Sequence, residues 1–288
     1  MLFIRFLREE KPTAWASFGR CISHVWQAGL GLVFPSSQGC LICDGKLPAA
    51  ALVELCQSCL ERLSLVGDNR CERCGRPQPR GQEYCRDCAE LQHFFVRNRA
   101  VAIYDGALKE QIQEVKYQYN RQLGLALGQI MGVVASRRRW VPKNALLLPV
   151  PLHPTRLRRR GYNQAELLLR GVEQYLNRPI LEPGIVIRSS ATGASNRLSP
   201  RERRANLRGV FEVLKPPKIA GKVLCVVDDI YTTGATLDEM ARTLLHAGAE
   251  AVYGLTLAIA IKDQDILDIA PIATGTVSAG SAGVEGRI

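Results

Sequence analysis

The sequence contains no apolar run as long as the ~20 residues that a membrane-spanning helix requires. The nearest candidate, residues 22–34, is shorter and includes His24 and Gln27. A secretory signal peptide is not expected, because Glu9 and Glu10 precede this run and no small-residue cleavage site follows it. We therefore expect a cytoplasmic protein, with peripheral membrane contact through the N-terminal apolar segment as a further hypothesis.

Two common nucleotide-binding motifs are also missing. The chain has no G-x-x-x-x-G-K-[ST], so a P-loop is not predicted, and no G-x-G-x-x-G, so a dinucleotide fingerprint is not predicted. The formal net charge is nevertheless +11, with a sequence pI near 9.3. This balance favours anionic partners such as phosphates, nucleic acid or an acidic membrane face, although a basic surface without a partner is the simpler alternative.

Cysteine is scarce outside one short segment. Of the ten cysteines, only Cys21 and Cys225 stand alone, and Cys225 lies in an apolar run typical of a buried strand. The others form four Cys-x-x-Cys pairs, namely Cys40/Cys43, Cys56/Cys59, Cys71/Cys74 and Cys85/Cys88. Two such pairs complete a tetrahedron of thiolates around one zinc ion, so the spacing predicts two structural zinc sites.

The pairing of these knuckles stays open at this point. The simplest scheme is sequential, with the first two pairs on one ion and the last two on the other, but an interleaved scheme uses the same residues. An iron–sulfur cluster is the weaker alternative, because its ligand spacings are usually less regular. The module either stabilises the N-terminal region alone or contacts nucleic acid or protein, helped by its arginines: Arg70, Arg73, Arg76, Arg80 and Arg86.

Beyond the cysteines, apolar strands alternate with helical patterns, which predicts an α/β domain with a parallel sheet. Strands are expected at residues 100–104, 145–150, 181–188, 223–227 and 251–260, and helices at residues 107–116, 123–136, 165–175 and 236–246. We divide the chain into an N-terminal helical segment (1–38), a double zinc ribbon (39–92), the α/β domain (99–261) and a disordered tail (262–288).

Residues 223–236, VLCVVDDIYTTGAT, join an apolar strand, two acids and a small hydroxyl-rich loop to a helix. The amides of such a loop and the helix N-terminus favour an anion at one place. Thr232, Thr233 and Thr236 add hydroxyl donors, Gly234 and Ala235 let the backbone approach closely, and Asp228 and Asp229 are acceptors for sugar hydroxyls. Simple helix capping is the alternative interpretation.

This segment resembles the phosphoribosyl pyrophosphate signature of type I phosphoribosyltransferases. Three further segments resemble the ComF family, which includes ComFC-like and GntX-like proteins: LPVPLHPTRLRRRGYNQA at 148–165, YDGALKEQIQEVKYQ at 104–118 and LSPRERRANLRGVF at 198–211. The family also carries N-terminal cysteine pairs. The resemblance covers roughly residues 25–260 and implies a type I phosphoribosyltransferase-like fold behind the zinc-ribbon module.

The resemblance assigns roles to individual residues. Asp228 and Asp229 would hold the ribose hydroxyls, and residues 232–236 would cradle the 5-phosphate. The 149–162 loop would meet pyrophosphate through Arg156, Arg160 and Gly161. A mobile loop at 188–211 would close over the ligand, as lids do, with Arg197, Arg201, Arg204 and Asn206 as its polar residues.

Two positions depart from the family pattern. The Gln expected after Thr192 in the mobile loop is replaced by a region containing Ser195 and Asn196, and the strand after the signature helix ends in Ala258 and Ile259 instead of Ala-Arg. Both weigh against turnover more than against binding. Lys116 and Tyr117 are candidates for the acceptor side, with an ordinary surface lysine as the alternative.

Two hypotheses of different classes follow. The first is a phosphoribosyltransferase that binds phosphoribosyl pyrophosphate, or a similar phosphosugar, with Mg²⁺ and transfers it to an unidentified base or amine. The second is a single-stranded nucleic-acid-binding protein that keeps the phosphate site for binding or regulation. The family's link to natural transformation and DNA utilisation implies single-stranded DNA and DNA-processing proteins as partners.

Overall fold

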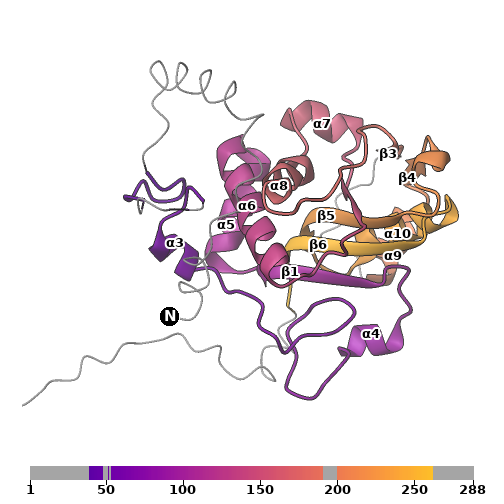
Figure 1. Ribbon diagram of the computed structural model, residues 1–288, viewed down its shortest axis with the longest axis horizontal. Coiled ribbons are helices and arrows are strands. Elements are labelled where there is room, and N and C mark those ends of the chain that lie inside the picture. The colour runs from indigo at the N-terminus through magenta and orange to yellow at the C-terminus, as the bar shows by residue number, and fades with distance from the viewer. Residues whose placement is uncertain (1–38, 48–50, 52, 191–199, 262–288) are drawn as a thin grey trace, which may run out of the picture.

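The computed structural model describes residues 39–47, 51, 53–190 and 200–261 (Figure 1). The helical segment predicted at 1–38 and the tail predicted at 262–288 lie outside the described residues, as does part of the mobile loop, residues 191–199.

A parallel sheet forms the centre of the α/β domain. Its strands are β1 (Arg97–Ile103), β2 (Leu146–Pro149), β5 (Val223–Tyr231) and β6 (Ala251–Ile259), in the order β1-β6-β5-β2. β5 and β6 are buried on both faces, which explains why they read as continuous apolar runs. The predicted α/β class with a parallel sheet flanked by helices is confirmed.

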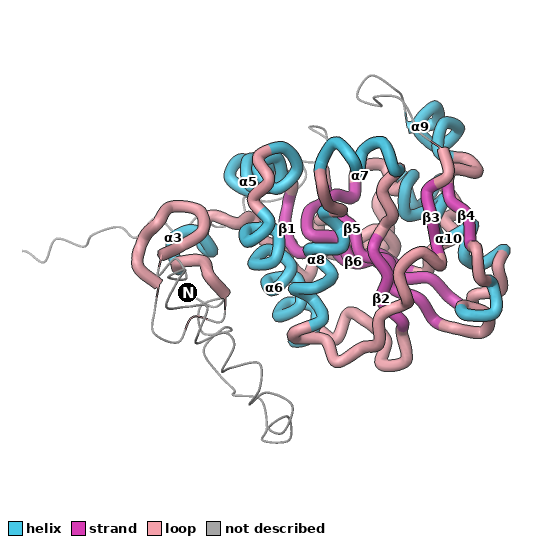
Figure 2. The backbone as a smooth tube through the Cα atoms, turned by 90° about the horizontal axis from the view of Figure 1, so that it is seen from above, coloured by secondary structure: helices cyan, strands magenta, loops and turns pink. Residues whose placement is uncertain are grey.

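Helices cover both faces of this sheet (Figures 1 and 2). On one face lie α5 (Gly106–Tyr117), α6 (Arg121–Arg137) and α8 (Gln164–Glu173), whose apolar residues share one core cluster with the sheet. On the other face lies α10 (Ala235–His246), which α9 (Pro200–Leu207) contacts. The site residues at the carboxyl ends of the strands are thus carried by elements packed on both sides.

The two cysteine modules pack against different layers. The first contains α3 (Gln57–Glu61) and contributes buried residues to the cluster of α5, α6 and α8. The second contains α4 (Arg86–Glu90) and contributes buried residues to the cluster of α10. Figure 1 shows α3 beside the α5–α6 layer and α4 below β1.

Other elements differ from the sequence expectations. The strand predicted at 181–188 is reduced to β3 (Val186–Arg188), because Pro183 and Gly184 form a turn with Gly184 at φ 79°. β3 pairs antiparallel with β4 (Phe211–Val213), and a short 3₁₀ helix, η1 (Pro216–Lys218), follows.

The predicted pyrophosphate loop contains a helix, α7 (Pro154–Arg160). Pro154 stands in its first turn, where a missing N–H costs nothing. The His153 ring accepts a hydrogen bond from the Thr155 amide at 3.2 Å, and Gly161 ends the helix at φ 72°. These caps explain why a run of basic residues is helical here.

No helix in the described part of the chain combines the length and the apolar character needed to cross a bilayer.

α6 and α8 pack unusually closely, through the middle and the last turn of α8. A Cβ atom on Gly128 would overlap the Leu168 backbone, and one on Gly171 would overlap the backbone of α6 at Leu125 and Gln129. Both glycines are buried within their helices. The close backbone approach therefore depends on the absence of side chains at these positions.

We predict that Gly128→Ala lowers the free energy of unfolding by about 1–3 kcal/mol, as expected for overpacking. Helix propensity alone predicts the opposite sign, by about 1 kcal/mol. Urea unfolding followed by circular dichroism measures the change, with Ser136→Ala at an exposed position of α6 as the matched control. A stabilised Gly128→Ala protein would contradict the close packing.

Candidate functional site

The eight paired cysteines form two tetrads. Their members are Cys40, Cys43, Cys56 and Cys59 in the first and Cys71, Cys74, Cys85 and Cys88 in the second. Within each tetrad the Sγ atoms lie within 4.8 Å of one another. The sequential pairing is therefore the one that the structure adopts.

The spacing of the sulfurs fits zinc. The Sγ atoms of Cys43 and Cys56 are 3.5 Å apart, and those of Cys74 and Cys85 are 3.6 Å apart. Zn–S bonds of about 2.3 Å in a tetrahedron place sulfurs about 3.8 Å apart. With all four positions of each tetrad filled by thiolates, the sites are structural.

The pKa of each thiol in the second tetrad depends on its contacts with the other three. Hydrogen bonds from its three neighbours lower the pKa of Cys71 far below its usual range, and the same contacts raise the pKa of Cys74 well above it. A bound divalent cation supplies the positive charge that lets all four thiols ionise together.

The second zinc ribbon contacts the Thr-rich loop directly. The side chain of Arg76 is only 4 % exposed, pairs with Asp87 at 2.9 Å, and donates through Nη2 to the Thr232 carbonyl at 3.3 Å. Burial lowers the pKa of Arg76. Its hydrogen bond to Asp87 and the negative charges of the nearby thiolates and carboxylate raise that pKa by a larger amount, so the net shift is upward. This arginine is therefore a fixed cation between the ribbon and the loop.

A second link runs through His93. Its Nε2 lies 3.5 Å from the Cys88 sulfur, and its Nδ1 lies 3.4 Å from Oδ1 of Asp238 in the first turn of α10. The same Asp238 oxygen accepts a hydrogen bond from the Phe94 amide at 2.8 Å. His93 is not a member of the tetrad; it lies between one cysteine ligand and a carboxylate, where an outer partner can orient the ligand.

The Thr-rich loop closes tightly around its glycine. Gly234 has φ 75°, and a Cβ atom there would overlap the ring of Tyr231. Thr232, Gly234 and Thr236 line a cavity of only about 20 Å³ that Asp228 also borders. The loop ends at the N-terminus of α10, where backbone amides and the helix dipole favour an anion, but the space is about that of one water molecule.

The two acids of the signature face opposite sides of β5. The strand continues past them to Tyr231, so consecutive side chains alternate between faces. Asp228 borders the cavity of the Thr-rich loop, whereas Asp229 is 7 % exposed on the α5–α8 side. The structure therefore brings Asp228, but not Asp229, to the loop.

The electrostatics of the two carboxylates are unlike those of surface acids. Burial, and then the Asp229 carboxylate, raise the pKa of Asp228 to about 8, and its Oδ1 accepts a hydrogen bond from the Asp229 amide at 2.9 Å. Asp229 forms an ion pair with Lys116 at 2.5 Å. The Asp228 carboxyl group thus holds its proton more tightly than a surface acid does.

Lys116 is not an ordinary surface lysine. Its side chain is 18 % exposed and paired with Asp229. Burial lowers the pKa of Lys116, but the carboxylates of Asp229 and Asp228 raise it by a larger amount, so the net shift is upward. Tyr117, the other acceptor-side candidate, is exposed, with the Arg160 guanidinium 5.6 Å above its ring.

Of the predicted pyrophosphate residues, Arg160 lies nearest the acids. It hydrogen-bonds to Gln164, and burial lowers its pKa while Asp229 partly restores it. Arg156 is exposed on α7, and Gly161 is the αL residue that ends this helix. A further cation, Arg188 of β3, is 8 % exposed; burial, and then the nearby positive charge of Arg156, lower its pKa, while Asp228 partly restores it.

The predicted mobile-loop residues are only partly described. Arg204 of α9 donates to the Thr233 carbonyl at 3.3 Å, so this helix covers the loop. Asn206 is exposed on α9, and Arg201 lies in its first turn. Arg197 lies outside the described residues.

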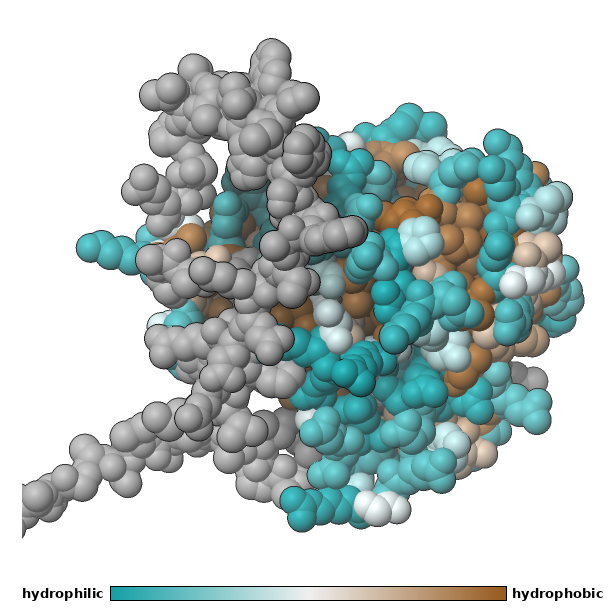
Figure 3. All heavy atoms as spheres, viewed as in Figure 1, coloured by the Kyte–Doolittle hydropathy of each residue, from teal (hydrophilic) through white to brown (hydrophobic). Residues whose placement is uncertain are grey.

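A separate cavity of about 300 Å³ lies beside β2 at the open edge of the sheet. It is lined largely by apolar residues, including Leu148, Pro149, Leu169 and Ile180, with Glu166 at its border. On the face seen in Figure 3, hydrophobic residues likewise show between hydrophilic ones.

Known proteins resemble this chain over most of its length. A double zinc ribbon family model matches residues 29–89. The DNA utilization protein YhgH of Escherichia coli is 31% identical over 205 residues, 69% of this chain and 87% of that protein. The chain belongs to the ComF family. Two further relatives are Competence protein ComFC of Bacillus subtilis, 30% identical over 76% of this chain and 93% of its own length, and Competence protein F of Haemophilus influenzae, 29% identical over 76% and 96%.

Near the candidate site of this ComF-family chain lie further residues that the sequence analysis did not assign to it. Arg76 was noted only as one arginine of the module, and Arg188 only as the end of a predicted strand and the first residue of the mobile loop. Asp238 and His93 had no signal, because their link depends on a contact between segments 145 positions apart. Tyr231 could have been found from its place directly before the Thr-Thr-Gly turn.

We predict that the zinc-loaded protein binds two zinc ions per chain, one in each tetrad. Cys43→Ser and Cys71→Ser should each retain one, measured by elemental analysis. The thermal midpoint should fall further in Cys71→Ser, because Cys71 is fully buried in the core cluster of α10 whereas Cys43 is exposed. Equal destabilisation of the two variants would contradict this asymmetry.

Proposed function

We propose that this ComF-family chain binds phosphoribosyl pyrophosphate, or a closely similar phosphosugar, together with Mg²⁺. The observation that carries the proposal is the shared cavity of Asp228 and the Thr-rich loop at the carboxyl end of β5. In open α/β sheets, ligands bind beyond the carboxyl ends of strands.

The chemistry of the loop supports the phosphate end of this ligand. Free amides at the start of α10 and the helix dipole favour a dianionic phosphate. The hydroxyls of Thr232, Thr233 and Thr236 are further donors. Asp228, on the same side, is an acceptor for the ribose hydroxyls.

The cations around the acids support the pyrophosphate end. Arg160 and Arg188 are partly desolvated, so their attraction to a phosphate group is stronger than that of exposed arginines. Mg²⁺ prefers oxygen ligands, and bound with pyrophosphate it would neutralise negative charge there. Asp229 is occupied by Lys116, so Asp228 is the carboxylate of the pair that remains for the ligand.

The names of the relatives point to DNA as the biological context. Proteins named for competence and for DNA utilisation are about 30% identical to this chain. We infer that the phosphosugar site serves a protein of DNA uptake or DNA utilisation. If an acceptor base or amine is joined to the ribose, the arginines stabilise the charge of the departing pyrophosphate.

Calorimetric titration of the zinc-loaded protein with phosphoribosyl pyrophosphate and Mg²⁺ tests the proposal. Asp228→Asn should weaken binding by about 10- to 100-fold, the usual value of a hydrogen bond to a charged group. Glu250→Gln, an exposed acid before β6, is the control and should bind as the wild type does. No binding by the folded wild-type protein would refute the proposal.

Asp229→Asn belongs in a separate experiment. It would leave Lys116 buried without its partner, and removing one member of a buried ion pair typically costs about 3–5 kcal/mol. Loss of binding in that variant would therefore report loss of folding as much as loss of a ligand contact.

The raised pKa of Asp228 predicts a pH dependence of stability. The folded protein holds this proton up to a pH of about 8, whereas the unfolded chain releases it near 3.8. Stability is therefore lost as pH rises through this window. Asp228→Asn should gain at least about 1 kcal/mol over wild type between pH 5 and pH 8, since one pKa unit corresponds to about 1.4 kcal/mol. Denaturant unfolding at several pH values measures this, and a gain independent of pH would contradict it.

A further inference from the structure

The N-terminus of α10 has no side-chain cap. The helix begins at Ala235, and Gly234 before it has no side chain that accepts from the helix amides. The amides of Thr233, Gly234 and Ala235 donate to no acceptor among the described residues. Unpaired amides at a helix N-terminus are donors for phosphate. The orientation of these amides therefore affects how well the Thr-rich loop holds a phosphate group.

Two arginines bind the carbonyl groups that alternate with these amides. Arg76 donates through Nη2 to the Thr232 carbonyl at 3.3 Å. Arg204 donates through Nη2 to the Thr233 carbonyl, also at 3.3 Å. A trans peptide directs its C=O and N–H groups in opposite directions, and the described part of the chain contains no cis peptide. The Thr233 amide therefore points away from Arg76. In the same way, the Gly234 amide points away from Arg204.

The acid in the first turn of α10 is kept away from the same amides. A carboxylate at this position can accept from helix amides and compete with a bound anion. Oδ1 of Asp238 instead accepts from the Phe94 amide at 2.8 Å and lies 3.4 Å from Nδ1 of His93. Both partners follow the last cysteine of the second zinc ribbon. The ribbon thus contacts α10 as well as the loop.

Arg76 itself is placed with little freedom. Its side chain is 4 % exposed, and its Nη1 donates to Asp87 at 2.9 Å. Its backbone carbonyl accepts from the Cys71 amide at 2.7 Å. Cys71 belongs to the second tetrad, and Asp87 stands between two further members, Cys85 and Cys88. Both groups that hold Arg76 are therefore fixed by the residues that would hold zinc.

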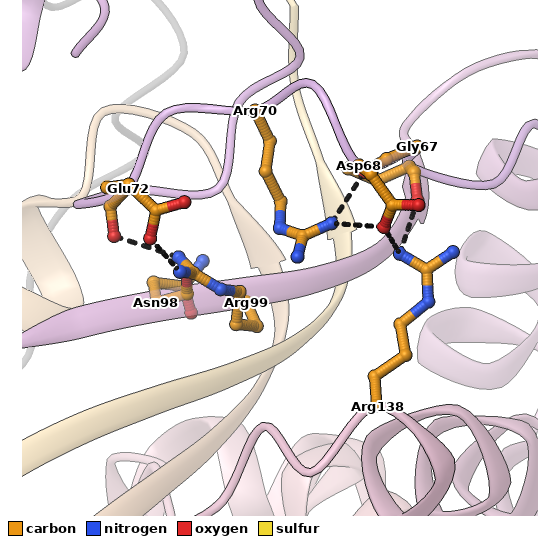
Figure 4. A network of polar contacts seen from close by, with 8 residues as sticks. Gly67, Asp68, Arg70, Glu72, Asn98, Arg99 and Arg138 are labelled. Carbon is orange, nitrogen blue, oxygen red and sulfur yellow. Dashed lines mark hydrogen bonds and ion pairs between the residues drawn. The ribbon is translucent and has the colours of Figure 1, made fainter. Parts of the chain in front are cut away.

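The ribbon is in turn held on the α/β domain by charged contacts (Figure 4). Arg99 of β1 donates to the backbone carbonyl and to the carboxylate of Glu72, at 2.9 and 2.6 Å. Arg138, at the end of α6, donates to Asp68 at 3.1 Å, where the chain enters the ribbon. The position of Arg76 is therefore set by the fold around the ribbon and not by the loop that it contacts.

We propose that Arg76 is a positioning residue, through which the second zinc ribbon orients the Thr233 amide and thereby raises the phosphate affinity of the Thr-rich loop. The inference rests on the proposed phosphosugar binding and adds to it a residue from outside the α/β domain. It also implies linkage, because phosphosugar and zinc at the second tetrad should each tighten binding of the other by the same factor. The first tetrad packs on the opposite layer and should show no such linkage.

Arg76→Met tests this role, because methionine fills much of the same space and has no donor. Calorimetry of the zinc-loaded protein with phosphoribosyl pyrophosphate and Mg²⁺ should show binding about 5- to 30-fold weaker than in the wild type, since the backbone of one further residue must be ordered on binding. Unchanged binding would overturn the proposal. Tighter binding would also overturn it, because Arg76 would then only keep the cavity narrow.

Two controls separate positioning from charge and from stability. Arg80→Met removes the same charge from an exposed position of the same ribbon and should bind as the wild type does. Asp87→Asn weakens the ion pair of Arg76 but leaves Thr232 its donor, so it should lower the thermal midpoint with much less loss of affinity. A zinc content of two ions per chain establishes that the ribbon of each variant is folded. Equal loss of affinity in Asp87→Asn and Arg76→Met would contradict the proposal.

A measurement without ligand distinguishes failure of this inference from failure of the proposed function. Backbone order parameters for the amides of Thr233 and Gly234, from nuclear magnetic resonance relaxation, should fall from about 0.85 toward 0.6 in Arg76→Met. They should stay at the wild-type value in Asp87→Asn. If they fall but the wild-type protein binds no phosphosugar, the proposed function fails and the positioning of the loop stands. If they do not fall, the positioning role is wrong whatever the loop binds.

Competition with a zinc chelator measures the linkage. In Cys43→Ser, which keeps the second tetrad, phosphoribosyl pyrophosphate with Mg²⁺ should raise the zinc affinity severalfold. In Cys71→Ser, which keeps the first tetrad, the same ligand should leave the zinc affinity unchanged. Equal effects on the two variants would overturn the inference that the second ribbon is the one coupled to the loop.

Discussion

The attachment of the second zinc ribbon to the signature strand and its helix is the constraint around which the candidate site is built. Arg76 holds the Thr232 carbonyl, and His93 joins a cysteine sulfur to Asp238 in α10. Behind them Asn98 donates to the Cys74 carbonyl and to Thr256 of β6. These contacts are buried or partly buried, so they are strong where they are satisfied and costly where one partner is lost.

Metal and loop are therefore parts of one folded unit. Phe95 meets Tyr231 edge to face at 6.2 Å, and Tyr231 in turn fills the space under Gly234. Structural zinc contributes folding free energy outright. In this chain that free energy would stabilise the segment next to the Thr-rich loop, which gives the small metal module a structural role beside an α/β domain that has its own core.

The amino-acid sequence was sufficient for the broad architecture. Apolar runs marked the four parallel strands, helical periodicity marked α5, α6, α8 and α10, and Cys-x-x-Cys spacing marked both zinc tetrads. It was insufficient where local and tertiary signals compete. The basic run at 156–160 is helical because of its caps, and the strand expected at 181–188 is cut short by a Pro-Gly turn. The sequence also did not show that Asp228 and Asp229, although adjacent, face opposite sides of β5 and therefore have different surroundings.

The narrow cavity at the Thr-rich loop has a consequence for affinity. About 20 Å³ is less than a phosphate group occupies, so a phosphate that binds inside this cavity requires the loop to open wider. The apparent dissociation constant is then the intrinsic constant divided by the open fraction. An opening free energy of about 1.4 kcal/mol alone would weaken the apparent affinity tenfold. Arg204 of α9 and Arg76 of the second zinc ribbon each hold one loop carbonyl, and thereby act on the population of the open state.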